Sequence, residues 1–359
     1  MKLKTIVRAV TAVALASTSL LGSTAQAVAA AGHAQFEVAK HYTLGGAEGW
    51  DYIGYDPVRH HLFISRASHV QVVDTNSGRL VGEIANTDGV HGFAFVQDQK
   101  LGFVTNGRAD TITVVDLDTL RTVGTINAGG PDPDGIMYAA NVKRLYVSNG
   151  HDQSVSAIDP VTRKVVATMA VGGKPESLAA DDDGHIFVNI EDKGEIVAMD
   201  GRSNKVLAHW SIAPCEGPSG LAIDKKSERL FTVCANHRMM VIDARSGRRV
   251  AELPIGGHPD AAAFDPALKM AFSSNGADGT LTVVHEDDAD HYTVLQNVPT
   301  EVGAKSMALD GDAHRVYLVS SKFGPAPAAT ADNPRPHPSV IPETFNVLVA
   351  QRKAQSAGN

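Results

Sequence analysis

Short apolar runs alternate with turn residues along most of the chain, and residues 131–159 show the pattern most clearly. This segment contains three such runs, at 135–139, 145–148 and 155–158, each closed by turn residues. Runs of this length that are rich in β-branched or aromatic residues predict antiparallel strands. A single three-stranded sheet has too little core to be stable alone, so the pattern predicts further copies that pack against it.

Seven copies emerge when the chain is aligned on the polar residue at the start of each first strand, which we call the opener. The openers are Asp51, His91, Asp134, Glu176, Ser219, Asp260 and Lys305, at intervals of 40, 43, 42, 43, 41 and 45 residues. Fifteen residues after each opener the second strand ends, at Arg66, Asn106, Asn149, Glu191, Cys234, Asn275 and Ser320. A period of about 40 to 45 residues made of strands alone is typical of a propeller. The sequence therefore predicts an all-β, seven-bladed β-propeller with four-stranded antiparallel blades.

The first strand of each copy is predicted to be innermost. The third residue after the opener is Gly or Ala in six of the seven copies, as the crowded centre of a ring requires. The seventh copy lacks a fourth strand, and residues 36–44 show the outer-strand pattern that would complete it. Such closure removes exposed sheet edges. We expect one propeller over residues 36–350, with a Pro-rich insertion at 323–342 in the seventh blade and a polar tail at 351–359.

The N-terminus has the composition of an export signal. Lys2, Lys4 and Arg8 precede an uncharged apolar stretch at 9–21, and residues 25–27, Ala-Gln-Ala, form a small-x-small cleavage site. We expect a signal peptide over residues 1–27, with cleavage after residue 30 as the alternative. The apolar stretch is too short for a membrane span, so the mature protein is predicted to be periplasmic or secreted, with no membrane span.

Charge and cysteine content narrow the classes of partner. The net charge of −8 opposes binding to nucleic acid or to anionic membranes. The chain has 359 residues, of which 43% are hydrophobic, enough to bury a large core. Its two cysteines, Cys215 and Cys234, are predicted to form a disulfide in an oxidising compartment, and a thiolate metal site is the alternative.

Two second strands resemble a known signature. The segments at 103–106, Phe-Val-Thr-Asn, and 146–149, Tyr-Val-Ser-Asn, resemble the YVTN repeat of the exported seven-bladed propellers of the YncE-like family. Residues 217–224, 272–276 and 323–336 also resemble that group, and the resemblance covers residues 36–350. It implies a seven-bladed fold, export, and a binding or scaffold role without one shared reaction. Because propellers also host lactonases, lyases and electron-transfer subunits, the fold cannot choose among activities.

The openers are expected to surround the central channel on the face where the loops converge. Four of them are carboxylates: Asp51, Asp134, Glu176 and Asp260. Two carboxylates about 4 Å apart repel by about 4 kcal/mol at an effective dielectric constant of 20. Such a rim must bind a cation, raise some pKa values, or keep its acids apart and hydrated.

Asp51, His91 and Asp134, from neighbouring blades, form a predicted site for a divalent transition metal ion or a metal chelate. His258, two residues before Asp260, offers a second imidazole. A hydrated rim without a metal ion is the alternative interpretation.

Other residues complete the predicted ligand-binding set. Trp50 can stack on a ligand or pack on its neighbours. Arg66 and Glu191 replace the Asn found at the same position in three copies. The openers Glu176, Asp260 and Lys305 belong to the set as members of the rim. The three asparagines, Asn106, Asn149 and Asn275, are expected to tie the strand end to a loop.

We therefore expect a monomeric exported binding protein that holds a small-molecule ligand, metal ion or metal chelate over the channel, and not an enzyme. No catalytic residue is assigned, and Ser219 has no local base or Gly-x-Ser-x-Gly turn. A metal-dependent lactonase-like hydrolase or lyase is one alternative, in which rim acids hold a divalent cation that activates water. It would use Asp51, Asp134, Glu176, Asn106, Asn149 and Asn275. A scaffold that binds another exported protein is the second alternative.

Overall fold

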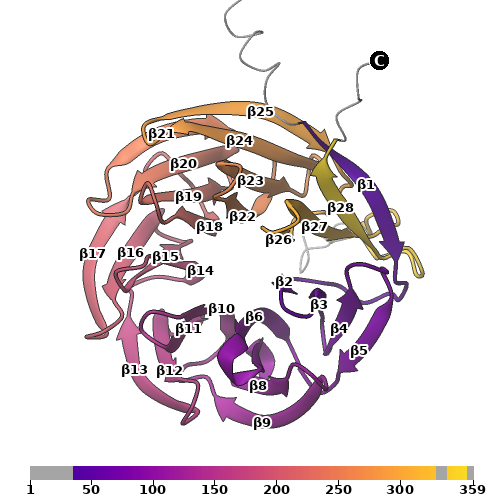
Figure 1. Cartoon of the computed structure of the whole chain (residues 1–359), viewed down its shortest axis with the longest axis horizontal. Coiled ribbons are helices and arrows are strands. Elements are labelled where there is room, and N and C mark those ends of the chain that lie inside the picture. Colours follow the sequence, from indigo (N-terminus) through magenta and orange to yellow (C-terminus); the bar gives the residue numbers. More distant parts are fainter. Residues whose placement is uncertain (1–34, 329–337, 354–359) are drawn as a thin grey trace, which may run out of the picture. The chain divides into compact units, whose positions relative to one another are not determined.

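The computed structural model describes residues 35–328 and 338–353. The predicted signal peptide with its cleavage site, the middle of the Pro-rich insertion and the last six residues lie outside the described residues. Within them, seven four-stranded antiparallel sheets are arranged in a ring (Figure 1). The predicted seven-bladed propeller is confirmed.

Each blade runs from an inner strand to an outer one, as Figure 1 shows. The innermost strands are β2 (Ile53–Asp56), β6 (Val90–Val96), β10 (Pro133–Ala139), β14 (Pro175–Ala180), β18 (Pro218–Asp224), β22 (Pro259–Asp265) and β26 (Met307–Asp310). The second strands are β3 (His61–Arg66), β7 (Leu101–Asn106), β11 (Arg144–Asn149), β15 (His185–Ile190), β19 (Arg229–Cys234), β23 (Met270–Asn275) and β27 (Arg315–Ser320). The openers thus lie at the start of the innermost strands or just before them.

The outer half of each blade follows. The third strands are β4 (His69–Asp74), β8 (Thr111–Asp116), β12 (Ser154–Asp159), β16 (Glu195–Asp200), β20 (Arg238–Asp243), β24 (Thr280–Asp288) and β28 (Asn346–Arg352). The outermost strands are β5 (Leu80–Ile84), β9 (Arg121–Asn127), β13 (Lys164–Ala170), β17 (Lys205–Ser211), β21 (Arg249–Pro254), β25 (His291–Pro299) and β1 (Phe36–Thr43). Two short 3-10 helices, η1 (Gln97–Gln99) and η2 (Gly107–Ala109), flank β7.

The core lies between neighbouring blades. Second and third strands are buried along most of their length because each blade is covered on both faces by its neighbours. Their sequences are accordingly continuous apolar runs, whereas outer strands such as β17 alternate between half-buried and exposed residues. Tyr146 of β11 shows the contact between blades, since its buried ring packs in the cluster shared with β15 and β16 and its hydroxyl donates to the Gly201 carbonyl at 2.9 Å.

The ring is closed by the N-terminal strand, as predicted. Strand β1 pairs with β28 from Phe36 opposite Arg352 to Thr43 opposite Asn346, so β28 continues two residues into the predicted tail. At the far end, the Phe36 backbone N–H donates to Gln296 Oε1 at 3.0 Å, and Gln296 Nε2 donates to the Phe36 carbonyl at 2.9 Å. The last blade is therefore joined both to the chain's beginning and to its neighbouring blade.

The predicted disulfide is confirmed. Cys215 and Cys234 form a disulfide bond, which links the loop before β18 to the end of β19. The two Cα atoms are 5.4 Å apart and both side chains are buried. In the part of the chain that the structure describes, there is no helix with the length and apolar character needed to cross a membrane.

Candidate functional site

Five consecutive openers form an arc in which acidic and basic side chains alternate around the channel. In order they are Asp260, Lys305, Asp51, His91 and Asp134, and we call them the rim arc. Lys305 Nζ lies 3.1 Å from Asp260 Oδ2 and 3.6 Å from Asp51 Oδ1. His91 Nδ1 lies 2.5 Å from Asp51 Oδ2 and 3.8 Å from Asp134 Oδ1. The structure thus brings together five predicted site residues from five different blades.

A hydroxyl group in one blade holds the opener of the next. Thr105 Oγ1 donates to the Asp134 carbonyl at 2.6 Å, and Ser148 Oγ donates to the Glu176 carbonyl at 2.5 Å. Ser274 Oγ makes the same bond to the Lys305 carbonyl. Thr105 and Ser148 are the third residues of the YVTN-like segments, so this part of the signature positions the backbone of the rim.

Glycines next to two openers allow the innermost strands to approach closely. A Cβ atom at Gly92, which follows His91, would lie 2.9 Å from the Asp134 carbonyl oxygen. A Cβ atom at Gly135, which follows Asp134, would lie 2.9 Å from the Glu176 carbonyl oxygen. Both distances are too short for carbon and oxygen. The absence of a side chain at these positions is therefore what lets neighbouring rim residues come within contact distance.

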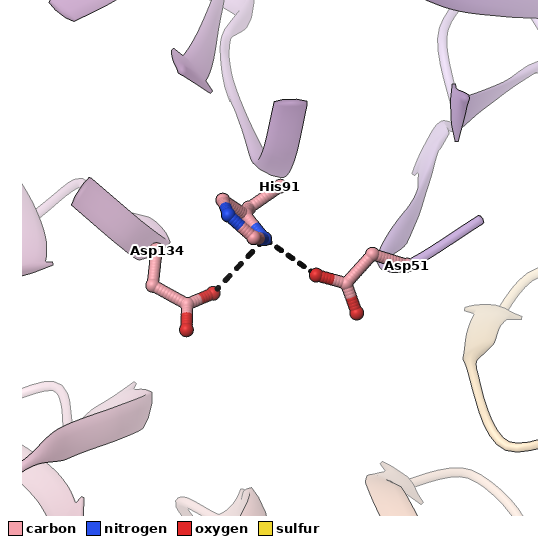
Figure 2. A group of neighbouring side chains, drawn as sticks. All are labelled: Asp51, His91 and Asp134. Carbon is pink, nitrogen blue, oxygen red and sulfur yellow. Dashed lines mark hydrogen bonds and ion pairs between the residues drawn. The ribbon is translucent and has the colours of Figure 1, made fainter. Parts of the chain in front are cut away.

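Asp51, His91 and Asp134 form the part of the rim arc that suits a metal ion. One donor atom from each residue lies within 4.8 Å of the others, and Figure 2 shows both carboxylates pointing toward the same ring nitrogen of His91. Bonds of about 2.0–2.1 Å in a tetrahedral zinc site place neighbouring donors about 3.3 Å apart. The observed separations of 2.5 and 3.8 Å lie on either side of that value. A small side-chain adjustment would therefore accommodate a divalent ion between the three groups.

Burial and neighbouring charges shift the protonation of this group. Burial alone would lower the pKa of His91, but the hydrogen bond to Asp51 and the charges of Asp134 and Asp51 raise it overall. Burial raises the pKa of Asp134 to about 6, although the charge of His91 opposes the shift. Among the described residues, Asp134 Oδ1 is buried without a hydrogen-bond partner. Protonated His91 attracts both carboxylates, but its Nδ1 is hydrogen-bonded to Asp51 alone.

Glu176 and Glu191 lie together around Lys174, a residue that the sequence analysis missed. Lys174 Nζ is 2.8 Å from Glu176 Oε1 and 2.6 Å from Glu191 Oε2. Burial and the charge of Asp134 raise the pKa of Glu176 to about 8, while Lys174 acts in the opposite direction. At Glu176 the effect of burial and of the Asp134 charge thus outweighs the attraction of Lys174.

We expect Glu176→Gln to make the stability of the metal-free protein less dependent on pH. The unfolded chain loses the Glu176 proton near the ordinary pKa of 4.5, whereas the folded protein keeps it up to about pH 8. The contribution of Glu176 to the stability of the wild type therefore falls as the pH rises from 4.5 to 8. Urea unfolding in EDTA measures the free energy of unfolding at pH 5 and pH 8. Relative to the wild type, the variant should be more stable at pH 8 than at pH 5. Parallel profiles for the two proteins would contradict this assignment.

Trp50, His258 and Lys305 line a pocket of about 440 Å³ beside the rim arc. Its other walls include Phe323 and Val340, which belong to the insertion in the seventh blade. Three of the predicted ligand-binding residues therefore meet at a second place on the loop face, and Lys305 belongs to both the pocket and the rim arc.

Arg66 lies away from the rim. Its side chain is 0% exposed, and its guanidinium lies over the Phe345 ring, 3.7 Å from the centroid. It donates to Gln71 Oε1 at 2.8 Å and to the Glu48 carbonyl at 3.1 Å. The structure thus uses Arg66 to hold the loop between β1 and β2.

The three asparagines join the end of the second strand to the third strand, and not to a loop as the sequence analysis expected. The side-chain amide of each donates to two hydroxyl groups, five and seven residues further along the chain. The pairs are Thr111 and Thr113 for Asn106, Ser154 and Ser156 for Asn149, and Thr280 and Thr282 for Asn275. These amide nitrogens are therefore already used within their own blades.

Tyr52 is a second channel residue that the sequence analysis missed. It lines a cavity of about 120 Å³ together with Asp260, Ser177 and Ser306. Burial and the charges of Asp134, Glu176, Asp51 and Asp260 raise its pKa. The sequence does mark Tyr52 as unusual, because the residue after the opener is Gly, Ala or Ser in all six of the other copies.

Comparison with known proteins agrees with this architecture. Residues 58–186 match the model of a family described as YNCE-like beta-propeller. No curated protein matches the sequence. Similar solved structures include Kuenenia stuttgartiensis hydrazine synthase, which is 20% identical with a TM-score of 0.69 and covers 78% of this chain and 94% of that one.

Two further solved structures have lower identity. U3-55K is 12% identical, with a TM-score of 0.71 and coverage of 87% of this chain and 99% of that one. The WD40 repeats of RRP9 are 11% identical, with a TM-score of 0.72 and coverage of 88% of this chain and 98% of that one. At these identities the likeness shows the fold alone. As its repeats predicted, the chain is a seven-bladed β-propeller, and residues 58–186 are similar to the YNCE-like beta-propeller family.

Proposed function

We propose that this protein is an exported binding protein that holds a divalent transition metal ion at Asp51, His91 and Asp134. The observation that carries the proposal is the convergence of one imidazole and two carboxylates from three blades, with donor atoms within 4.8 Å of one another. Mixed imidazole and carboxylate donors suit ions such as Zn²⁺, Ni²⁺ and Cu²⁺. The disulfide and the signal-like N-terminus support export.

Metal binding at this site competes with a proton. A metal ion between the three groups would replace the proton on His91 Nδ1, because a coordinating ring nitrogen must be unprotonated. Binding is therefore expected to release a proton, and affinity should fall about tenfold per pH unit below the raised pKa of His91, and more steeply below about pH 6, where Asp134 also takes up a proton.

The two alternative functions have less support from the site. The hydrolase alternative needs Asn106, Asn149 and Asn275 near the cation, but all three side chains are buried within their own blades, where they join the second and third strands. A protein scaffold requires only the broad loop face and gives no reason for the alternating charges of the rim arc.

Calorimetric titration of untagged, EDTA-treated protein with Zn²⁺ tests the proposal. We expect one site per chain in the wild type and affinity lower by at least about 100-fold in His91→Ala and Asp134→Asn, because each removes a metal ligand. His185→Ala is the matched control. Its imidazole also contacts an aspartate, Asp181, at 2.6 Å, but at the turn between β14 and β15, where His185 is the first residue of β15. Absence of binding by the wild type, or equal losses in all three variants, would contradict the proposed site.

A further inference from the structure

The pocket beside the rim arc has the size and composition of a small-molecule site. Its volume of about 440 Å³ lies within the range of about 300–1,000 Å³ that is usual for such sites. Blade 1 contributes Trp50, blade 6 contributes His258 and Ala277, and blade 7 contributes Lys305 and Phe323. Because three adjacent blades form it, the pocket exists only in the assembled ring.

Aromatic side chains fixed by neighbouring contacts form one wall. The Trp50 ring centroid is 5.9 Å from that of Phe323 and 5.2 Å from that of Phe345. Phe323 is held in turn by a β-bridge to Val340, and the adjacent Gly324 N–H donates to the Ser339 carbonyl at 2.8 Å. This wall is therefore formed before any ligand arrives, which lowers the cost of ordering on binding.

The polar groups of the pocket are hydrogen-bond donors. Lys305 lies at the end next to the rim arc, where Asp260 and Asp51 contact it at 3.1 and 3.6 Å. An ammonium group has three donor hydrogens, so two carboxylates leave one for a ligand. The described residues contribute no carboxylate to the lining, and His258 is exposed at its edge.

We propose that this pocket binds an aryl or alicyclic carboxylate. The ring of the ligand packs against Trp50 and Phe323, where aromatic faces favour offset contacts. Its carboxylate accepts a charge-assisted hydrogen bond from Lys305. The site differs from the metal site, since none of Asp51, His91 and Asp134 lines the pocket, and it does not require a bound metal ion.

Calorimetric titration with 2-naphthoate and with its neutral analogue 2-naphthalenemethanol tests the proposal, in EDTA so that the outcome is independent of the metal site. We expect Lys305→Met to weaken 2-naphthoate binding by at least about tenfold, the effect of losing a charged hydrogen bond. Binding of the neutral analogue should change by less than about twofold, since it does not depend on the ammonium charge.

A second variant keeps the test independent of the rim arc. Ala277 is an exposed lining residue, so Ala277→Phe should fill the pocket, abolish binding of both compounds and leave the melting temperature unchanged. Lys193→Phe introduces the same side chain at the equivalent, exposed position of blade 4 and should bind both compounds like the wild type. The proposal fails if the wild type does not bind 2-naphthoate at millimolar concentration. It also fails if Lys305→Met retains wild-type affinity for it, or if Lys193→Phe matches Ala277→Phe.

Discussion

Phe36→Ala should lower the free energy of unfolding by about 3–5 kcal/mol, the cost of removing a fully buried phenylalanine ring. Phe36 is 1% exposed, and its ring meets Phe272 edge-on with the centroids 5.3 Å apart. This residue joins the first strand of the chain to the neighbouring sixth blade. Its loss therefore weakens the contact that holds the ring closed as well as the local core.

Urea unfolding followed by circular dichroism measures this effect. Lys40→Ala is the matched control, because Lys40 lies on the same strand, pairs with Val349 and is exposed. We expect the control to unfold within about 0.5 kcal/mol of the wild type. If Phe36→Ala behaved like Lys40→Ala, closure of the ring would not depend on this contact.

Loss of the disulfide should destabilise the protein by about 3 kcal/mol, the value for a closed loop of roughly 20 residues in the chain-entropy model. The Cys215→Ala/Cys234→Ala variant should therefore unfold at lower urea concentration than the wild type. Alanine avoids burying a new polar group where the cysteines are 5% and 0% exposed.

Reductant provides the internal control for this prediction. Dithiothreitol should move the wild-type transition toward that of the double variant and leave the variant unchanged. Mass spectrometry after alkylation without reductant should find no free thiol in the folded protein. Two alkylated cysteines would contradict the bond.

The fold could be predicted from the sequence because its period is set by backbone geometry. Each blade needs the same number of residues between its opener and its second-strand end, and the regular positions of Asn106, Asn149 and Asn275 record that constraint. The same alignment placed Asp51 and His91 on adjacent blades facing one axis, and the sequence could therefore offer them as one site, with a hydrated rim as the alternative.

The remaining features of the site depend on contacts that no repeat position encodes. Arg66 occupies a second-strand end, yet its side chain is fixed by Phe345, which is far away in sequence. Lys174 lies two residues before an opener, a position that is Gly in four other copies. The pocket at Trp50 needs an insertion that occurs in one blade. Alignment predicts what the copies share, whereas these features arise where one copy differs from the rest.

The hydroxyl groups that hold the openers act on backbone carbonyls and not on side chains. At Asp134, Glu176 and Lys305 the identity of the opener is therefore separated from the bond that positions it. Evolution can thus change recognition at these places in the channel one residue at a time without redesigning the scaffold. The same separation makes these three positions a natural set for a combinatorial library.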